Sequence, residues 1–209
     1  MRLYTYWRST TSYRVRIALN LKGIAFQAIP IDLVNGDQKS PEYTRLNPGQ
    51  GVPTLELEDG SILSQSMAIL EFLEETYPQP PLLPVAKGDR AKVRAAGMTI
   101  ATDIHPVNNL RVVRKLKSMG HDQAAAVVWM NEWMKAGLTA FQDLIEPNSL
   151  FCFGDQPGLA DICLVPQLYN AHRWGMDLTR FSRLTEVEAR CLDIPAFRDA
   201  CPENQPDAA

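Results

Sequence analysis

Residues 51–54 form the motif Gly-Val-Pro-Thr, which could pair with the backbone of a bound peptide. Its proline falls at the first position of an expected strand, one of the few places where a sheet tolerates proline. A cis peptide bond before Pro53 would turn the backbone groups of Val52 outward, where an extended peptide could add to the sheet as a further strand. An ordinary trans proline at a sheet edge has the same sequence pattern, so the motif leaves both interpretations open.

Gln65 and Ser66 open an expected helix shortly after this motif. The Ser66 hydroxyl could cap the free backbone N–H groups of that helix, and the positive end of the helix dipole favours a carboxylate nearby. Simple N-capping explains the same pattern and does not exclude binding. Together the two motifs offer strand-like pairing for a peptide backbone beside an anion site, which suits glutathione.

The spacing of the cysteines and histidines does not indicate a metal site. The four cysteines lie in the second half of the chain without paired-ligand spacing, and the three histidines are scattered. We therefore expect free thiols and no metal site. The cysteines are Cys152, Cys163, Cys191 and Cys201.

The first eighty residues, which contain both motifs, alternate between strand-like and helix-like patterns. Asp59-Gly60 is a good signal for a tight turn between the last two strands. Because a helical crossover would join the first two strands, the order predicts a small mixed sheet with helices on it. The predicted strands are residues 3–7, 26–33, 54–57 and 61–63, and the predicted helices are residues 13–22, 41–46 and 66–77.

A proline-rich segment at residues 78–84 is too rich in proline for a helix or a central strand, so it predicts a linker. Every convincing pattern after it is helical. We therefore predict an α/β domain at residues 1–80 and an all-helical domain at residues 88–209. The helices expected in the second domain are residues 90–104, 106–119, 123–145, 159–174 and 184–192.

Composition and charge narrow the function classes. The chain has 209 residues, of which 45% are hydrophobic, and a net charge of -3. This balance argues against a general nucleic-acid binder, which needs a basic face for phosphate. No stretch approaches the ~20 apolar residues of a membrane helix, and no secretory signal is visible. We expect a cytoplasmic enzyme with no membrane or nucleic-acid partner.

Several runs spread over nearly the whole chain resemble the zeta-class glutathione transferases, a class that includes the maleylacetoacetate and maleylpyruvate isomerases. The resemblance implies a glutathione-transferase fold, with a thioredoxin-like first domain and a helical second domain. It also implies a homodimer that binds glutathione in the cleft between the domains. The runs that carry it are residues 8–19, 46–48, 52–55, 65–66, 103–106, 153–155, 160–167 and 204–207.

The resemblance also implies residues for the glutathione site. Val52 and a cis Pro53 would hold the cysteinyl backbone, while Gln65 and Ser66 would hold the γ-glutamyl group. Ser9 would donate to the sulfur and favour the thiolate, the nucleophilic form. Many zeta enzymes have a cysteine where this chain has Thr11, which leaves a second hydroxyl beside Ser9. Further contacts with glutathione are expected from Gln38, His105 and Asn109.

Three arginines match positions used by some or most of these isomerases, namely Arg8, Arg111 and Arg173. The implied reaction adds the thiolate to a cis double bond, lets the resulting single bond rotate, and eliminates the thiol to give the trans product. Addition pushes negative charge into the enolate of the keto group, which cations and hydroxyls would stabilise. The substrate also carries two carboxylates, for which the planar fork of arginine is a natural partner.

The leading interpretation is isomerisation of maleylacetoacetate, the step before fumarylacetoacetate cleavage in tyrosine breakdown. Maleylpyruvate isomerisation is the close alternative. A broader transferase or dehalogenase is another. From a different class, the chain could be a noncatalytic binding protein of the same fold, but such proteins often lose the activating hydroxyl or the glutathione pocket, and both motifs are retained here.

Gly158 stands where this fold usually has the hydroxyl residue of a capping box. Glycine is acceptable at a helix N-cap, and Asp161 can still bond back to the Gly158 amide. We therefore interpret Asp161 as a folding determinant and not as a catalytic acid.

Overall fold

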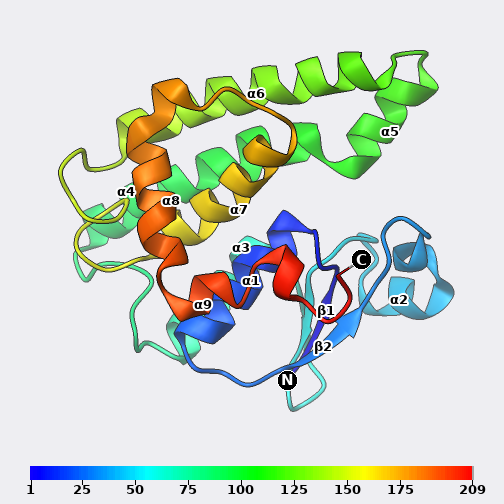
Figure 1. Ribbon diagram of the computed structural model, residues 1–209. Coiled ribbons are helices and arrows are strands. Elements are labelled where there is room, and N and C mark those ends of the chain that lie inside the picture. The colour runs from blue at the N-terminus through cyan, green and yellow to red at the C-terminus, as the bar shows by residue number, and fades with distance from the viewer. Residues whose placement is uncertain (209) are drawn as a thin grey trace. The chain divides into compact units, whose positions relative to one another are not determined.

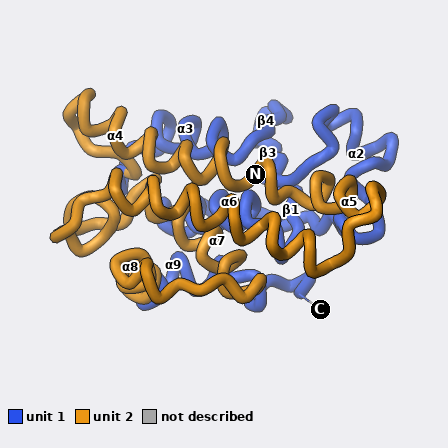
Figure 2. Tube along the Cα trace, turned by 90° about the horizontal axis from the view of Figure 1, so that it is seen from above, with its two compact units in different colours: residues 1–81, 192–209 blue, residues 82–191 orange. Residues whose placement is uncertain are grey.

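The computed structural model describes residues 1–208 (Figure 1). The chain divides into two compact units, which Figure 2 colours separately. The first unit comprises Met1–Pro81 together with the segment that starts at Leu192, and the second comprises Leu82–Cys191. The division therefore differs from the predicted second domain of residues 88–209, because the segment after residue 191 packs within the first unit.

The first unit contains a four-stranded mixed sheet in the order β2-β1-β3-β4. Strand β1 pairs in parallel with β2 and antiparallel with β3, and β3 pairs antiparallel with β4. The first strand ends two residues before the predicted limit, because the Ser9 amide donates to the Tyr6 carbonyl (3.0 Å) and turns the chain. The strands are β1 (Arg2–Thr5), β2 (Gln27–Pro30), β3 (Thr54–Glu56) and β4 (Ile62–Ser64).

Helix α1 forms the centre of the first unit and contacts α3 and α9. It begins three residues before the predicted start, because Ser9 is its N-cap and accepts from the Ser12 amide (3.2 Å). Apolar side chains of α1 and α3, such as Ile17 and Leu70, are completely buried. The helices are α1 (Thr10–Leu21), α2 (Pro41–Leu46), α3 (Ser66–Thr76) and α9 (Pro195–Arg198), with short 3-10 turns at Asp37–Lys39 and Pro202–Asn204.

Arg16 connects the C-terminal segment to the start of the first unit. Its side chain is 1% exposed. Its Nε donates to the Ala200 carbonyl (3.0 Å), and its two Nη atoms donate to the Thr5 hydroxyl (3.1 Å) and the Trp7 carbonyl (2.9 Å). The C-terminal segment thus completes the hydrogen bonding of a buried cation that also holds the corner between β1 and α1.

Every regular element that the structure describes in the second unit is a helix. The predicted helix at residues 90–104 is an α-helix that continues as a π-helix, and the predicted helix at residues 106–119 is a 3-10 turn followed by an α-helix. None of the helices in residues 1–208 is long and apolar enough to span a membrane. The elements are α4 (Lys87–Met98), the π-helix η2 (Thr99–Ile104), η3 (Pro106–Asn108), α5 (Leu110–Ser118), α6 (Gln123–Leu144), α7 (Leu159–Arg173), η4 (Thr179–Phe181) and α8 (Ser182–Leu192).

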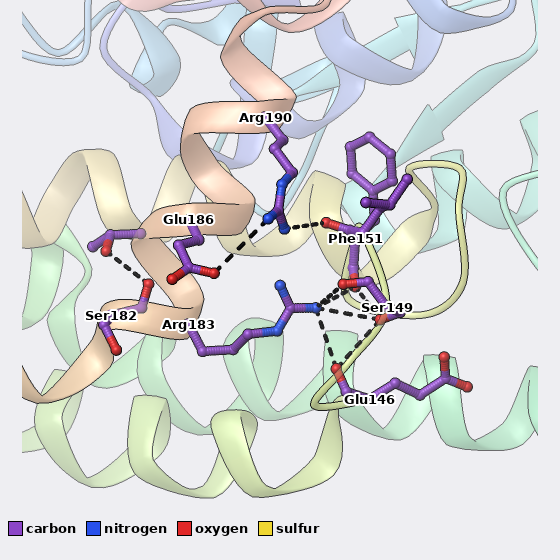
Figure 3. A network of polar contacts seen from close by, with 9 residues as sticks. Glu146, Ser149, Phe151, Ser182, Arg183, Glu186 and Arg190 are labelled. Carbon is purple, nitrogen blue, oxygen red and sulfur yellow. Dashed lines mark hydrogen bonds and ion pairs between the residues drawn. The ribbon is translucent and has the colours of Figure 1, made fainter.

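The loop between α6 and α7 is held by two arginines of α8 (Figure 3). Arg183 donates to the carbonyl oxygens of Ser149 (2.7 Å) and Phe151 (2.8 Å), and Arg190 donates to that of Leu150 (3.0 Å). Charge-assisted hydrogen bonds are stronger than neutral ones. These contacts therefore fix a loop that has no secondary structure of its own.

Asp161 stabilises the start of α7, as the sequence predicts. Its two carboxylate oxygens accept from the backbone amides of Gly158 and Cys152, each at 2.8 Å. Burial raises the pKa of this carboxyl, while the two amides act in the opposite direction. A Cβ atom on residue 158 would lie 2.8 Å from the Leu82 carbonyl oxygen, which itself accepts from the Leu159 amide. The close approach of that carbonyl explains the glycine.

We expect Gly158→Ser to destabilise the protein although it restores a capping hydroxyl. A serine cap gains only a few tenths of a kcal/mol over glycine, whereas forcing a side chain against backbone costs about 1–3 kcal/mol. Thermal unfolding measures the difference. Gly88→Ser is the matched control, because nothing lies within 4 Å of a Cβ atom there. A rise in Tm for Gly158→Ser would contradict the steric explanation.

Candidate functional site

A chain of hydroxyl groups links the start of α1 to the loop before β3. Ser9 Oγ lies 2.9 Å from Thr11 Oγ1, and Thr11 Oγ1 donates to the Val52 carbonyl at 2.8 Å. Ser9 and Thr11 are both half-buried. The structure therefore brings Thr11 together with Ser9, which is expected at the sulfur of glutathione, and with Val52, which is expected at its backbone.

The backbone around Val52 is fixed by buried polar groups. The peptide bond between Val52 and Pro53 is cis. On the other side of Val52, the Gly51 carbonyl accepts from the Tyr43 hydroxyl (2.6 Å) and from the Asn47 amide (2.9 Å). Burial raises the pKa of Tyr43, which keeps it protonated and able to donate. This support holds Val52 in place for backbone pairing.

Tyr43 and Asn47 are positioning residues that the sequence analysis missed. Both also bond the hydroxyl of Thr54, at 2.8 Å and 3.0 Å. Asn47 is followed by proline and glycine, a sequence that signals a turn and by itself predicts no role for the asparagine side chain. The short spacing between Asn47 and the motif at residues 51–54 is the signal for its role. An asparagine in a turn commonly forms a hydrogen bond with nearby backbone.

The N-terminus of α3 differs from the expected capping arrangement. Gln65, not Ser66, is the N-cap, and no side chain caps the helix. Gln65 has a φ of 71°, a conformation that costs a residue with a side chain about 1–3 kcal/mol and is concentrated at binding sites. The Ser66 hydroxyl instead accepts from Arg14 (3.3 Å). The expectation that Ser66 caps the helix is therefore wrong, because the N-cap residue is Gln65 and its side chain forms no capping hydrogen bond.

Arg14 adds positive charge at this helix end. Its side chain is 1% exposed, and it reaches Ser66 from α1. A buried guanidinium and a helix N-terminus both favour an anion. Arg14 lies within the run of residues 8–19 that carries the family resemblance, and a cation beside the apolar residues of this helix is a signal of a buried charge.

Gln38 has an unsatisfied acceptor. Its side chain is 6% exposed, and Oε1 is buried without a hydrogen-bond partner among residues 1–208. A buried acceptor without a donor is costly. An N–H group of a ligand would satisfy it. The backbone at Val52, the N-terminus of α3 with the nearby Arg14, and the Gln38 acceptor together fit a charged peptide such as glutathione.

Arg8 lies at the corner between β1 and α1, directly before Ser9. Its guanidinium stacks on the indole ring of Trp7, with Cζ 4.7 Å from the ring centroid. The backbone amide of Trp7 donates to the Asp207 carboxylate (3.0 Å). The C-terminal segment thus helps to position the aromatic ring on which Arg8 rests.

The predicted residues of the second unit form two groups. Where the π-helix gives way to α5, the Asn109 amide nitrogen lies 3.5 Å from His105 Nε2. Asn109 is also the N-cap of α5 and accepts from the Arg111 amide (3.1 Å), while the Arg111 side chain is exposed. At least one function of Asn109 is therefore to begin a helix.

Arg173 belongs to the other group, at the C-terminal end of α7. It is exposed, and its Cζ lies 4.5 Å from the centroid of the Trp174 ring. The neighbouring His172 bonds Glu188 of α8 (2.8 Å), whose pKa is raised by burial. This pair ties the end of α7 to α8.

Two further observations concern other kinds of site. Residues 1–208 contain no cluster of three or more metal-ligating side chains, and the four cysteines are free. A cavity of about 310 Å³ in the second unit is lined by none of the predicted site residues; its polar lining is Asn131, Glu132, Lys135, Asp177 and Arg180.

Two glutathione S-transferase family models match this chain. Residues 8–76 match the glutathione S-transferase N-terminal domain, and residues 130–198 match the C-terminal domain. A maleylacetoacetate isomerase from Pseudomonas aeruginosa is 47% identical, with 99% of this chain and 98% of that protein covered.

Two solved structures extend the likeness. A holo maleyl pyruvate isomerase, described as a bacterial zeta-class glutathione S-transferase, aligns over 100% of both chains with 43% identity and a TM-score of 0.97. A maleylacetoacetate isomerase from Anaeromyxobacter dehalogenans, with glutathione bound in its active site, is 40% identical and aligns with a TM-score of 0.90 over 100% of this chain and 97% of that one. This chain therefore belongs to the glutathione S-transferase family, in the zeta-class group of maleylacetoacetate and maleylpyruvate isomerases.

Proposed function

We propose that this chain is a glutathione-dependent cis–trans isomerase that converts maleylacetoacetate to fumarylacetoacetate, a step of tyrosine catabolism. The observation that carries the proposal is the hydrogen-bonded chain from Ser9 through Thr11 to the Val52 carbonyl, which places a hydroxyl donor for a sulfur beside a backbone site for a peptide. The 47% identity with a maleylacetoacetate isomerase, over nearly the whole chain, supports this substrate.

The first unit supplies most of the groups that would hold glutathione. The Val52 backbone would pair with the cysteinyl residue beside Pro53, and the N-terminus of α3, with Gln65 and Ser66, would hold the γ-glutamyl carboxylate. Gln38 would accept a further N–H group. From the second unit, His105 and Asn109 would add contacts. When bound, glutathione supplies the thiol that adds to the cis double bond and is later eliminated.

The hydroxyl and cationic groups of this chain would perform the remaining steps. Ser9 would donate to the sulfur and favour its ionised form. Arg8 and Arg173 would bind the substrate carboxylates and stabilise the negative charge that develops on the keto oxygen, and Arg111 would assist. Arginine suits this task because its planar fork can bind a carboxylate through two hydrogen bonds.

Maleylpyruvate is the second candidate substrate. The observation that favours it is the TM-score of 0.97 with a maleyl pyruvate isomerase. Both substrates share the maleyl end, which the same arginines would bind.

The proposal also covers assembly and location. As in other members of this family, we propose a homodimer that works in the cytoplasm. Light scattering of the purified protein measures the assembly, and a mass equal to one chain would contradict the dimer.

The test of function is a pair of progress curves with purified protein, glutathione and each cis keto acid in parallel. We expect turnover that needs glutathione but does not consume it, because the thiol adds and is then eliminated. Unchanged turnover without any thiol would contradict the proposal, as would consumption of one glutathione for each maleyl substrate.

We expect changes at Arg8 and Arg173 to weaken the use of the substrate and to leave glutathione affinity nearly unchanged. Replacement by lysine keeps the charge but loses the bidentate fork, so kcat/KM should fall even for this mild change. Alanine should cost more, about 1.5–3 kcal/mol for each charge-assisted contact. Substrate kinetics and calorimetric titration with glutathione measure the two effects.

Arg45→Ala is the control for these arginine variants, because the Arg45 side chain is 71% exposed and forms only a surface pair with Glu42. If glutathione binding falls in the Arg8 or Arg173 variants while substrate kinetics stay intact, the assignment of these arginines to the substrate is wrong.

A further inference from the structure

The hydrogen bonds around Thr11 have a fixed direction. A hydroxyl group has a single proton, and a backbone carbonyl can only accept. Because Thr11 Oγ1 lies 2.8 Å from the Val52 carbonyl oxygen, its proton is directed at that oxygen. The 2.9 Å contact between Ser9 and Thr11 must then use the proton of Ser9. Thr11 is the acceptor in this contact.

The remaining partner of Ser9 is consistent with this direction. The Ser12 amide donates to Ser9 Oγ (3.2 Å), so Ser9 accepts from the backbone of α1 and donates to Thr11. The four groups form one polarised chain, from the Ser12 amide through the two hydroxyls to the Val52 carbonyl. Each bond in such a chain strengthens the next. In this arrangement, neither hydroxyl proton is available to a sulfur atom.

We propose that Thr11 is a positioning residue that accepts the hydrogen bond of the Ser9 hydroxyl until a glutathione thiolate replaces it as the acceptor. The inference rests on the proposed function, because it concerns the thiol of bound glutathione. When the thiol ionises, its proton passes to solvent, and the Ser9 O–H bond rotates from Thr11 to the sulfur. Ser9 keeps its proton throughout and changes only its acceptor. Thr11 keeps its own proton on Val52.

The charge of the sulfur decides when the change of acceptor happens. A neutral thiol is a weak acceptor and does not displace the Thr11 oxygen, whereas hydrogen bonds to an ionised group are about twice as strong as neutral ones. The thiolate therefore becomes the acceptor of the Ser9 hydrogen bond, but only after the bond between Ser9 and Thr11 is broken. That competition makes the thiolate less favourable than it would be beside a Ser9 that had no other acceptor.

The expected signature is a lower pKa of the bound thiol when Thr11 can no longer accept. Thr11→Val keeps the branched shape of the side chain and removes the hydroxyl. From the typical net strength of a neutral hydrogen bond, the pKa should fall by roughly half a unit to one unit. Thr11→Ser retains the hydroxyl and should keep the parent value.

The experiment titrates the thiolate absorbance of glutathione bound to the parent protein, Thr11→Val, Thr11→Ser, Ser9→Ala and the double variant Ser9→Ala/Thr11→Val. Ser9→Ala alone should raise the thiol pKa. In the Ser9→Ala background, Thr11→Val should not change the thiol pKa, because there is no Ser9 hydroxyl left to turn from Thr11 to the sulfur. A general disturbance of the loop would instead shift the pKa equally with and without Ser9.

The outcomes separate this inference from the proposed function. An unchanged or raised pKa in Thr11→Val overturns the inference, as does an equal shift in both backgrounds, while isomerisation by the parent protein would leave the proposed function standing. Failure of the parent protein to bind glutathione overturns both. If Thr11→Val does not fold, as judged by circular dichroism, Thr11→Ala replaces it with the same expected direction.

Discussion

Ser9→Ala is expected to lower kcat by about 10²–10³-fold at saturating glutathione, the cost of removing one preorganised donor from a developing negative charge. Thr11→Ala should have a much smaller effect. The structure supplies the reason: the Thr11 proton is directed at the Val52 carbonyl, whereas Ser9 can turn its proton towards a sulfur. Steady-state kinetics of both variants measure the difference.

A control is needed because Ser9 also caps α1, so Ser9→Ala removes a helix cap worth about 1 kcal/mol. Asp122→Ala is the matched variant, since Asp122 caps α6 by accepting from the Ala125 amide (2.8 Å). It should lower stability by a similar amount and leave kcat unchanged. Equal, small losses of kcat in Ser9→Ala and Thr11→Ala would instead assign thiol activation to backbone amides.

Arg16→Met should lower the free energy of unfolding by about 2–6 kcal/mol, because each of two buried carbonyl oxygens that loses its donor costs about 1–3 kcal/mol. The change keeps an unbranched side chain of similar length but removes every donor from a completely buried site. It leaves the carbonyl oxygens of Trp7 and Ala200 without the hydrogen bonds that they have in the native protein. Urea or guanidinium denaturation measures the loss.

The comparison variant for Arg16 is Arg2→Met. The Arg2 side chain is half exposed and pairs with Glu56 at the surface, so only a small change is expected. A loss below about 1 kcal/mol for Arg16→Met would show that the buried guanidinium contributes little net stability, as happens for some buried ionic groups.

The order of strands and helices could be predicted because it depends on local periodicity. Residues 41–46 form α2 as expected, and the turn at Asp59-Gly60 joins β3 to β4. Boundaries were less predictable where a cap or a turn decides them. The N-cap Ser9 makes α1 begin earlier than predicted. The N-cap Asn109 makes α5 begin inside the predicted helix of residues 106–119.

Partners that are distant in the sequence were beyond prediction. The segment after residue 191 joins the first unit because Arg16 bonds Ala200 and the Trp7 amide bonds Asp207. No local sequence pattern in the segment after residue 191 predicts these contacts. The same reason explains why Arg14 was given no role, since its partner Ser66 is 52 residues away.

The motifs of the candidate site were visible because each is local. Ser9 and Val52 come from short runs with recognisable chemistry, and the structure connects them through Thr11. The geometry added what residue types alone do not contain, namely the direction of each hydrogen bond. It also corrected one role, because the Ser66 hydroxyl bonds Arg14 and does not cap α3.

The bond between Arg16 and Ala200 has a consequence for synthesis on the ribosome. The sheet strands and α1 emerge first, yet the Arg16 guanidinium meets its last partner only when residue 200 has left the exit tunnel. Until then, a cation that is buried in the finished protein lacks part of its hydrogen bonding, a state that costs several kcal/mol. The unit whose strands are translated first is therefore completed last, and we expect the corner between β1 and α1, which Arg16 holds, to be fixed only after residue 200 has emerged.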